Sequence, residues 1–411
     1  MPHQNLIEKY AKLAVEIGAN VQKDQMVVIR SSTETTALAR ALTEAAYKAG
    51  AKRVHVNWGD DYVSRLGLEH MSLETLQNIP EWVVEQSKYA LEEGACFISI
   101  TSPIPGLNAG IDPVKMQQSG LAAMKKLGFF QAHMMANKAQ WTVIAAPNAV
   151  WAQKVFPDKA ADDAVEALWD AILKACHVTE DNDPVDAWAQ HNKTLAAHNA
   201  KLNDHQFDAL HFSNSLGTDF TLRLVDNHVW AGGSETTGTG VRFNPNIPTE
   251  ESFTIPHKHG ANGRVYATKP LNYQGNLIEG FWLEFKEGEA VDFGAEKAED
   301  SLRSLLEFDE GSRYLGEIAL VSHYSPISQS GILFLNTLFD ENASCHMALG
   351  RAYPMNVKDG VNMDEKSLEA AGANLSKTHV DFMFGSADMK IVGIHKDGSE
   401  RIIFDKGEFV F

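Results

Sequence analysis

Hydrophobic positions in the first part of the chain alternate between two periods. Apolar residues recur at helical spacing over 5–17 and 37–49, and Gly50 ends the second of these helices. Short apolar runs of strand type lie between and after them, at 26–29, 54–58, 96–100 and 141–146. The order strand, helix, strand is that of a βαβ unit, whose strands are parallel and joined by a crossover helix. We therefore expect an α/β domain with a parallel sheet.

The pattern changes beyond this region. Helical spacing continues at 166–176 and, after a polar break that ends at Pro184, at 185–202. Short alternating runs separated by Gly, Asn and Pro then predict strands at 210–212, 220–224, 253–255, 264–268 and 281–285. The rest of the chain is thus expected to be β-rich.

Helices are predicted within this β-rich part at 295–306 and around Cys345 and Ser367. We accordingly divide the chain into an N-terminal α/β domain at 1–183, a helical connector at 184–205 and a β-rich α+β domain at 206–411. No internal repeat is visible.

Charge and cysteine content exclude several classes of function. Lys and Arg number 36 and Asp and Glu number 54, a formal net charge of −18. This charge repels phosphate backbones and anionic lipid, so we expect no nucleic-acid and no membrane partner. No run approaches the ~20 apolar residues of a membrane span, and the first residues lack the apolar core of a secretion signal. The three cysteines form no CxxC pair, which favours a reducing cytoplasm.

A carboxylate stands inside an apolar strand near the end of the chain. Glu317 lies within the run 315–321, whose other members are Leu, Gly, Ile, Ala and Val. A free buried carboxylate is very costly, so Glu317 must be paired, protonated or bound to a cation. A salt bridge with Arg or Lys and a metal site both satisfy this requirement.

His379 and Asp381 form a second candidate for a metal-binding position. On a strand of period two both point to one face, while Val380 and Phe382 point to the other. An imidazole nitrogen and a carboxylate oxygen on one face are ligands for Zn, Mn or Co. Exposed pairs of this kind are common by chance, but the apolar residues at 382–384 indicate a buried strand end.

A third candidate joins Glu341 and His346, which are just over one helical turn apart. If this segment is helical, both could face one cavity. Alternatively Asp340 or Asn342 caps the helix and His346 makes a hydrogen bond in the core. Cys345 beside His346 suggests a thiol protease, but adjacent residues on a helix do not face each other, so this interpretation is poor.

Glu250 and Glu251 would usually form a solvated turn, and on a strand only one of them could enter a shared site. Together with the other clusters they make up a donor set of carboxylates and imidazoles almost without sulfur. Such a set suggests two divalent cations that share a bridging carboxylate, rather than one structural zinc.

The chain resembles a known family through the stretches 246–251, 316–317, 340–353 and 378–383. They resemble the M29 metallopeptidases, the thermophilic-type aminopeptidases. The resemblance runs over the whole length and includes the opening helix and 214–220. Motifs of this length are not expected by chance.

The resemblance implies a cytoplasmic aminopeptidase with two divalent metal ions, which removes N-terminal residues from peptides, and a homodimer. The 206–411 domain is then the metallopeptidase domain. The family's metal ligands carry over to Glu251, Glu317, Glu341, His346, His379 and Asp381, and its catalytic tyrosine to Tyr353. His257 and His259 depart from the pattern and are candidates for adventitious ligands or substrate contacts.

We hypothesise that two ions, Zn, Co or Mn, activate a water molecule and polarise the scissile carbonyl. Glu317 would bridge them or accept the proton of the water, Tyr353 would donate to the oxyanion, and Glu250 would receive the substrate's α-amine. Two alternatives stay open: another dimetal amidohydrolase or carboxypeptidase, and a non-enzymatic α/β binding protein whose acidic residues and histidines form salt bridges and caps.

Overall fold

The computed structural model describes residues 4–411, which divide into two compact units. One unit comprises the chain up to Asn192 together with Ser234–Pro248, and the other comprises Lys193–Gly233 and Thr249–Phe411. The first of the boundaries between them along the chain lies within helix α9 (Pro184–His205). The division predicted from the sequence, with domains at 1–183 and 206–411 and a connector at 184–205, stays a prediction.

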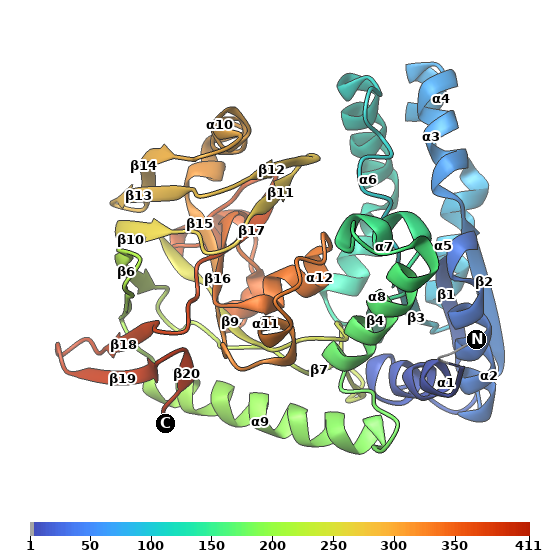
Figure 1. The fold of residues 1–411 in the computed structure, drawn as a ribbon, viewed down its shortest axis with the longest axis horizontal. Helices are drawn as coiled ribbons and strands as arrows, with labels where there is room; N and C mark the ends of the chain where they lie inside the picture. Colours follow the sequence, from blue (N-terminus) through green and yellow to red (C-terminus); the bar gives the residue numbers. More distant parts are fainter. Residues whose placement is uncertain (1–3) are drawn as a thin grey trace. The chain divides into compact units, whose positions relative to one another are not determined.

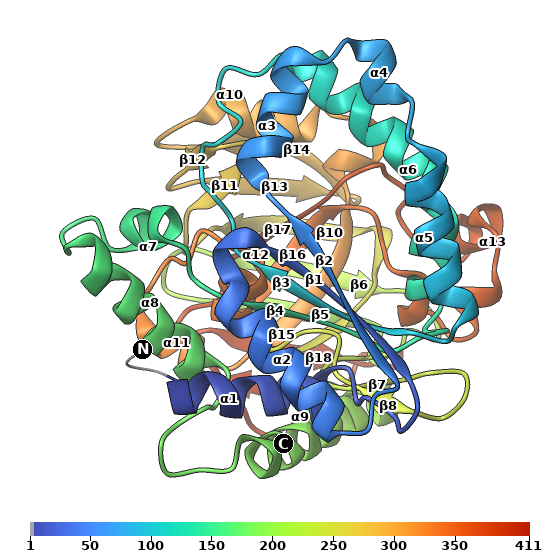
Figure 2. The same ribbon diagram turned by 90° about the vertical axis from the view of Figure 1, so that its right-hand side faces the viewer.

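The first unit contains a sheet of four parallel strands in the order β2-β1-β3-β4, visible in Figure 2. Its strands are β1 (Met26–Ser32), β2 (Arg53–Gly59), β3 (Cys96–Thr101) and β4 (Trp141–Ala145). Helix α2 (Thr36–Lys48) crosses over between the first two strands and buries Leu38, Ala39, Leu42 and Ala46. The predicted α/β fold with a parallel sheet is confirmed.

The other elements of this unit are mainly helices. They are α1 (Gln4–Leu13), which continues as a π-helical turn at Ala14–Gly18, the turn η2 (Thr33–Thr35), α3 (Asp61–His70), α4 (Leu73–Gln77), α5 (Glu81–Glu92), α6 (Pro113–Met135), α7 (Ala149–Val155), α8 (Ala161–Ala175) and the hairpin of β7 (Glu235–Thr236) with β8 (Arg242–Phe243).

The long helix α6 was not predicted from the sequence pattern. It spans 23 residues, of which only Phe130 and Met134 are buried. Its other apolar side chains are spread around the helix, so no stripe of helical period marks it. Its start follows local rules, because the Asp112 side chain accepts a hydrogen bond from the Val114 N–H and Pro113 occupies the first turn.

The second unit contains a sheet of eight antiparallel strands in the order β14-β13-β10-β6-β5-β18-β19-β20 (Figure 1). They are β5 (Ala209–Ser213), β6 (Asp219–Leu224), β10 (Pro256–Tyr266), β13 (Trp282–Lys286), β14 (Glu289–Gly294), β18 (Lys390–Ile394), β19 (Glu400–Asp405) and β20 (Glu408–Phe409). The predicted β-rich character of this part is thus confirmed.

A second, four-stranded antiparallel sheet has the order β17-β16-β15-β9. Its strands are β9 (Glu251–Thr254), β15 (Leu315–Val321), β16 (His346–Gly350) and β17 (His379–Met383). Ile318, Met347 and Phe382 on one face of this sheet pack into the same hydrophobic core as Phe212 and Leu283 of the larger sheet. That packing leaves the opposite face of the small sheet for polar side chains.

The second unit also contains short elements. These are the hairpin of β11 (Leu271–Tyr273) with β12 (Asn276–Ile278), α10 (Glu299–Leu306), α11 (Pro326–Ser330), α12 (Thr337–Asp340), α13 (Glu365–Ala370) and the turns η3 (Glu310–Arg313), η4 (Glu341–Ala343), η5 (Pro354–Asn356) and η6 (Gly360–Asn362).

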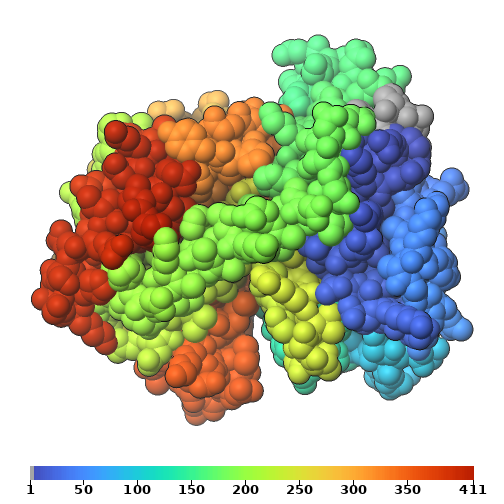
Figure 3. Space-filling view, turned by 90° about the horizontal axis from the view of Figure 1, so that it is seen from below, coloured from blue at the N-terminus to red at the C-terminus, as the bar shows by residue number. Residues whose placement is uncertain are grey.

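The C-terminal residues lie against the C-terminal half of α9, as the space-filling view in Figure 3 shows. The ring of Phe409 stacks on His198 at a centroid distance of 4.1 Å, and the Lys201 ammonium lies 5.3 Å from the centre of the Phe411 ring. Aromatic stacking and a cation–π contact therefore hold the end of the chain on this helix.

The prediction of a helix around Cys345 is wrong. Helix α12 ends at Asp340, and after the turn η4 the backbone is extended at Ser344, with φ −168° and ψ 174°. The Cys345 carbonyl accepts the backbone N–H of Phe384, and the strand β16 follows at once. Pairing with residues distant in sequence overrides the local helical pattern here.

No helix within residues 4–411 combines the length and the apolar character that crossing a bilayer requires.

Candidate metal centre

The polar face of the small sheet brings together side chains from four strands. Glu317 is paired in register with Ala348, and Ala348 with Asp381. His346 is paired with Ala319, and His379 with Gly350, on the same strands. Because directly opposite residues of an antiparallel sheet point to the same side, these acidic and imidazole side chains share one face. The residues paired with them on this face, Ala319, Ala348 and Gly350, are small.

His346 is held by a backbone carbonyl and directed into the cluster. Its Nδ1 lies 3.1 Å from the Ser344 carbonyl oxygen, and since a carbonyl only accepts, Nδ1–H donates this bond. Its Nε2 lies 3.0 Å from Glu251 Oε2 and 3.7 Å from Glu317 Oε1. The backbone hydrogen bond fixes the tautomer that leaves the Nε2 lone pair for a ligand.

His379 is held in the same way. Its Nδ1 donates to the Arg351 carbonyl oxygen at 2.7 Å. Its Nε2 lies 3.4 Å from Asp381 Oδ1 and 3.8 Å from Glu317 Oε2. Metal-binding histidines usually donate their other ring N–H to a carbonyl or carboxylate, so both imidazoles have the arrangement of metal ligands.

The carboxylates and imidazoles of the cluster perturb one another strongly. Burial raises the pKa of Glu317, and burial together with Asp381 and Glu251 raises that of Glu341 further. Burial alone would lower the pKa of His379, but the negative charges of Asp381 and Glu317 outweigh it and raise the value to about 10. The cluster therefore attracts positive charge.

Lysine and arginine side chains do not satisfy this demand. Within residues 4–411, Glu251, Glu317 and Asp381 form ion pairs with His346 and His379, and none with Lys or Arg. Asp381 Oδ1 is buried without a hydrogen bond, since its 3.4 Å approach to His379 is poorly placed for one. The salt bridge with Arg or Lys considered for Glu317 is thus absent here, and the donor set fits a divalent metal.

The donor atoms fall into two groups that share one residue. Glu251, Glu317 and His346 form one group, and Glu317, His379 and Asp381 form the other, with all donor atoms of a group within 4.8 Å of one another. Each group has the mixture of oxygen and nitrogen donors that Zn, Mn or Co accept. Five of the six predicted ligands therefore lie together, and Glu317 lies at the centre.

Glu341 and Tyr353 flank this cluster. The Glu341 carboxylate belongs to neither group, but it interacts electrostatically with Asp381, Glu251 and His346. The ring of Tyr353 lies 4.7 Å from that of His379, and burial with the nearby carboxylates raises the pKa of its hydroxyl well above the usual range. The hydroxyl is therefore protonated at neutral pH and available as a donor.

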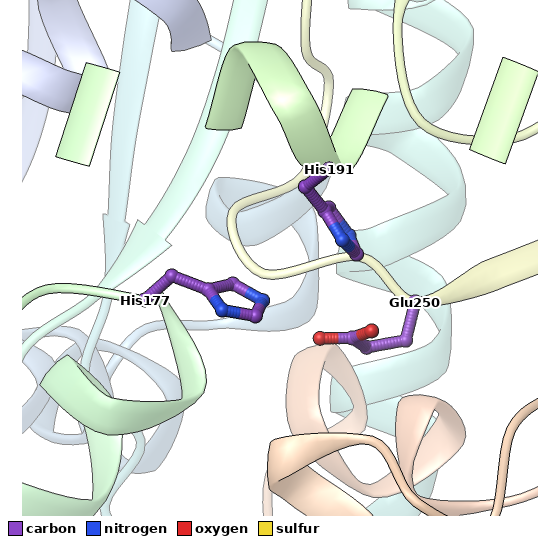
Figure 4. A group of neighbouring side chains, drawn as sticks. All are labelled: His177, His191 and Glu250. Carbon is purple, nitrogen blue, oxygen red and sulfur yellow. The ribbon is translucent and has the colours of Figure 1, made fainter. Parts of the chain in front are cut away.

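Several other histidines and one further glutamate lie outside the cluster. Within the first unit, the rings of His177 and His191 lie 4.9 Å apart (Figure 4). Glu250 of the second unit, labelled in the same figure, directly precedes β9 and belongs to neither group that contains Glu317. The extra imidazoles of the sequence pattern are also separate: His257 packs against Gly372, and His259 lies edge-to-face with Tyr314 at 5.6 Å.

The sequence pattern missed the groups that hold the candidate ligands. The Ser344 and Arg351 carbonyls orient the two imidazoles, and the buried Asn342 accepts the Glu250 N–H at 2.7 Å. A backbone carbonyl carries no side-chain signature, so no sequence signal marks the first two. The position of Asn342 directly after Glu341 is the one clue to the third.

Comparison with known proteins agrees with this geometry. The family model of thermophilic metalloproteases (M29) matches residues 3–409. The chain belongs to the M29 family. It is 47% identical to aminopeptidase AmpS of Bacillus subtilis and 44% identical to aminopeptidase 2 of Geobacillus stearothermophilus, over 98% of each chain in both cases. The structure of wild-type AmpT from Thermus thermophilus superimposes with a TM-score of 0.92 at 37% identity, over 100% of both chains.

Membership of the M29 family confirms the predicted activity class. The chain is a metal-dependent aminopeptidase, and it uses divalent metal. The alternatives of a non-enzymatic binding protein and a carboxypeptidase are not supported, because the relatives that match 98% of the chain are aminopeptidases.

The cysteines provide a test that separates this chemistry from thiol catalysis. All three are buried thiols outside any disulfide, and burial raises the pKa of Cys96 to about 12 and that of Cys345 to about 11. Because the thiolate is the nucleophile, we expect iodoacetamide at neutral pH to leave the activity unchanged and to label the thiols only after denaturation. Mass spectrometry measures the labelling. Loss of activity in step with alkylation of Cys345 would contradict this expectation.

Proposed function

We propose that this aminopeptidase holds two divalent cations on the polar face of the small sheet, with Glu317 shared between them. The observation that carries the proposal is the pair of donor groups that have Glu317 in common. Glu251, Glu317, Glu341 and Asp381 contribute four negative charges, and both imidazoles act as neutral donors. Two divalent cations balance those four charges, whereas one leaves two uncompensated.

The identity of the ions follows from the donors. Four carboxylates and two imidazoles without sulfur suit Zn, Co or Mn. When bound, such ions lower the pKa of a water molecule and polarise the scissile carbonyl. Glu251 and His346 would hold one ion, and His379 and Asp381 would hold the other. Glu341 would supply a further carboxylate ligand.

The chain's own residues supply the remaining steps. Glu317 accepts the proton of the attacking water, since its buried carboxylate is the one residue common to both donor groups. The protonated hydroxyl of Tyr353 donates a hydrogen bond to the oxyanion that develops on the carbonyl oxygen. Glu250 receives the α-ammonium of the substrate, which restricts the reaction to peptides with a free N-terminus.

Metal analysis combined with two substrates tests this function. We expect an aminoacyl chromogenic substrate to be hydrolysed, hydrolysis to cease on chelation and to return on addition of metal, and about two ions to be bound per chain. The matching N-acetylated substrate is expected to resist. Hydrolysis of the acetylated substrate would indicate a different amidohydrolase, and full activity in chelator would contradict the metal mechanism.

Replacement of Tyr353 by Phe tests the oxyanion step. Loss of one such donor typically costs about 10²–10³ in kcat, so we expect a decrease of that order with little change in KM and an unchanged metal content. The ring keeps its contact with His379, 4.7 Å away between centroids, so the fold should be retained. A variant that loses metal would show instead that the tyrosine supports the ligands.

The predicted homodimer and the cytoplasmic location stay proposals as well. They rest on the family resemblance and on the three cysteines, none of which forms a disulfide. Light scattering on the purified chain measures the mass of the assembly, which we expect to be twice that of the 45.2 kDa chain.

A further inference from the structure

A buried amide lies between two of the segments that carry candidate ligands. Asn342 is the middle residue of the turn η4 and is fully buried. Its Oδ1 accepts the backbone N–H of Glu250 at 2.7 Å, and its Nδ2 donates to the Leu338 carbonyl at 3.2 Å. The amide thus bonds to a segment 92 positions away and to the helix that precedes its own turn.

We propose that Asn342 is a positioning residue that ties the segment with Glu250 and Glu251 to the turn with Glu341, and thereby sets the geometry of the metal ligands. The inference rests on the proposed two-metal site. It concerns the relation between two ligand-bearing segments that no strand pairing joins directly.

The two segments differ in how they are otherwise held. Glu251 is fixed by the pairing of β9 with β15, where it lies opposite Val321. Glu341 lies in a turn outside the sheet. The turn is anchored on its N-terminal side, because Asp340 accepts the N–H groups of Phe334 and Asn336 at 2.7 and 2.9 Å. The Asn342 side chain therefore links an anchored turn to a fixed strand.

The chemistry of the position favours asparagine. One buried group must accept an N–H and another must donate to a carbonyl, and a primary amide does both without charge. Aspartate could accept the Glu250 N–H but could not donate to Leu338, and it would add a negative charge beside the acidic cluster. Alanine would leave both backbone groups without these partners, at a cost typical of buried unsatisfied groups.

Two variants and a matched control test the proposal in the full-length chain. Asn342→Ala removes both hydrogen bonds, and Asn342→Asp retains the acceptor for Glu250. Asn203→Ala is the control, because Asn203 also accepts one N–H and donates to one carbonyl, both of Trp230, on helix α9. Apparent Zn affinity is measured by competition with a chelator, together with the melting temperature of the metal-free chain and the kcat and KM of the metal-loaded chain.

We expect Asn342→Ala to weaken Zn binding about 10- to 100-fold, as loss of a partner behind the ligands typically does, and to lower kcat more than it raises KM. Asn342→Asp should bind Zn more tightly than Asn342→Ala, because the bond to Glu250 remains. Asn203→Ala should lower the melting temperature but leave the Zn affinity within about twofold of the unmodified chain, well short of the loss typical of such partners.

Zn affinity and kcat of Asn342→Ala equal to those of the unmodified chain would overturn the proposal, whatever its melting temperature. If Asn342→Ala does not fold, an Asn342→Asp variant that folds and binds Zn more than 100-fold more weakly would overturn it too, since the retained bond would then have no effect. Failure of the unmodified chain to bind Zn would instead refute the two-metal site. The two failures are therefore distinguishable.

Discussion

Replacement of Glu317 by Gln is expected to abolish most of the activity and to release metal. The change removes the residue that both donor groups share, which is a proposed ligand and the proposed general base, and general-base catalysis alone contributes about 10²–10⁴ in rate. We therefore expect kcat/KM to fall by at least about 10³, the middle of that range, and the bound metal to fall below two ions per chain. Kinetics and elemental analysis of the same preparation measure both effects.

The same variant should become more stable in its metal-free form. Burial raises the pKa of Glu317 above its ordinary value, so at neutral pH folding is opposed by the cost of keeping this carboxylate ionised. A glutamine has nearly the same shape and no charge, which removes that cost. A higher melting temperature of metal-free Glu317→Gln, combined with lost activity, would identify a residue retained for function at the expense of stability.

The control for this experiment is Glu299→Gln at an exposed position of helix α10. Glu299 forms an ion pair with Arg303 whose side chains are 46% and 48% exposed, so its loss should change neither metal content nor rate. Full metal content and full activity in Glu317→Gln would remove Glu317 from the site.

Enlargement of Ala348 is expected to have an effect of similar size without touching a ligand. Ala348 is fully buried and is paired with Glu317 on one side and with Asp381 on the other. Its methyl group therefore lies on the face that carries the donors, between two of them. In Ala348→Leu the longer side chain would occupy the space of the ions, so we expect little bound metal and a loss of activity comparable to that of the chelated enzyme.

Met347→Leu provides the matched control, because Met347 is adjacent but points into the hydrophobic core on the opposite face. A volume-conserving change of this kind usually costs less than about 1.5 kcal/mol and should leave the metal in place. Circular dichroism shows whether Ala348→Leu is folded, since overpacking costs about 1–3 kcal/mol. A folded Ala348→Leu with a full complement of metal would show that the ions do not lie above this residue.

The organisation of the fold was largely predictable from local pattern. Alternation of strand and helix signals predicted the parallel sheet, because parallel strands require a crossover of this kind. The two exceptions have different causes. Helix α6 buries only two side chains and so shows no apolar stripe, and the segment around Cys345 forms long-range strand pairs instead of the predicted helix.

Parts of the site were also predictable from the sequence. A carboxylate inside an apolar strand marked Glu317, and strand period two put His379 and Asp381 on one face, where the structure has them. Both inferences depend only on neighbours in sequence and on the cost of burying charge. The roles of all these residues as ligands stay a proposal.

By itself, the sequence determined which residues are too polar for their surroundings, and the resemblance to the M29 family determined the activity class. Only the tertiary structure decided that the strands carrying Glu251, Glu317, His346 and Asp381 are neighbours, that the Ser344 and Arg351 carbonyls orient the imidazoles, and that Asn342 reaches Glu250. The physical reason is that strand register and backbone hydrogen bonds between distant segments arise from packing of the whole unit, which no local period encodes.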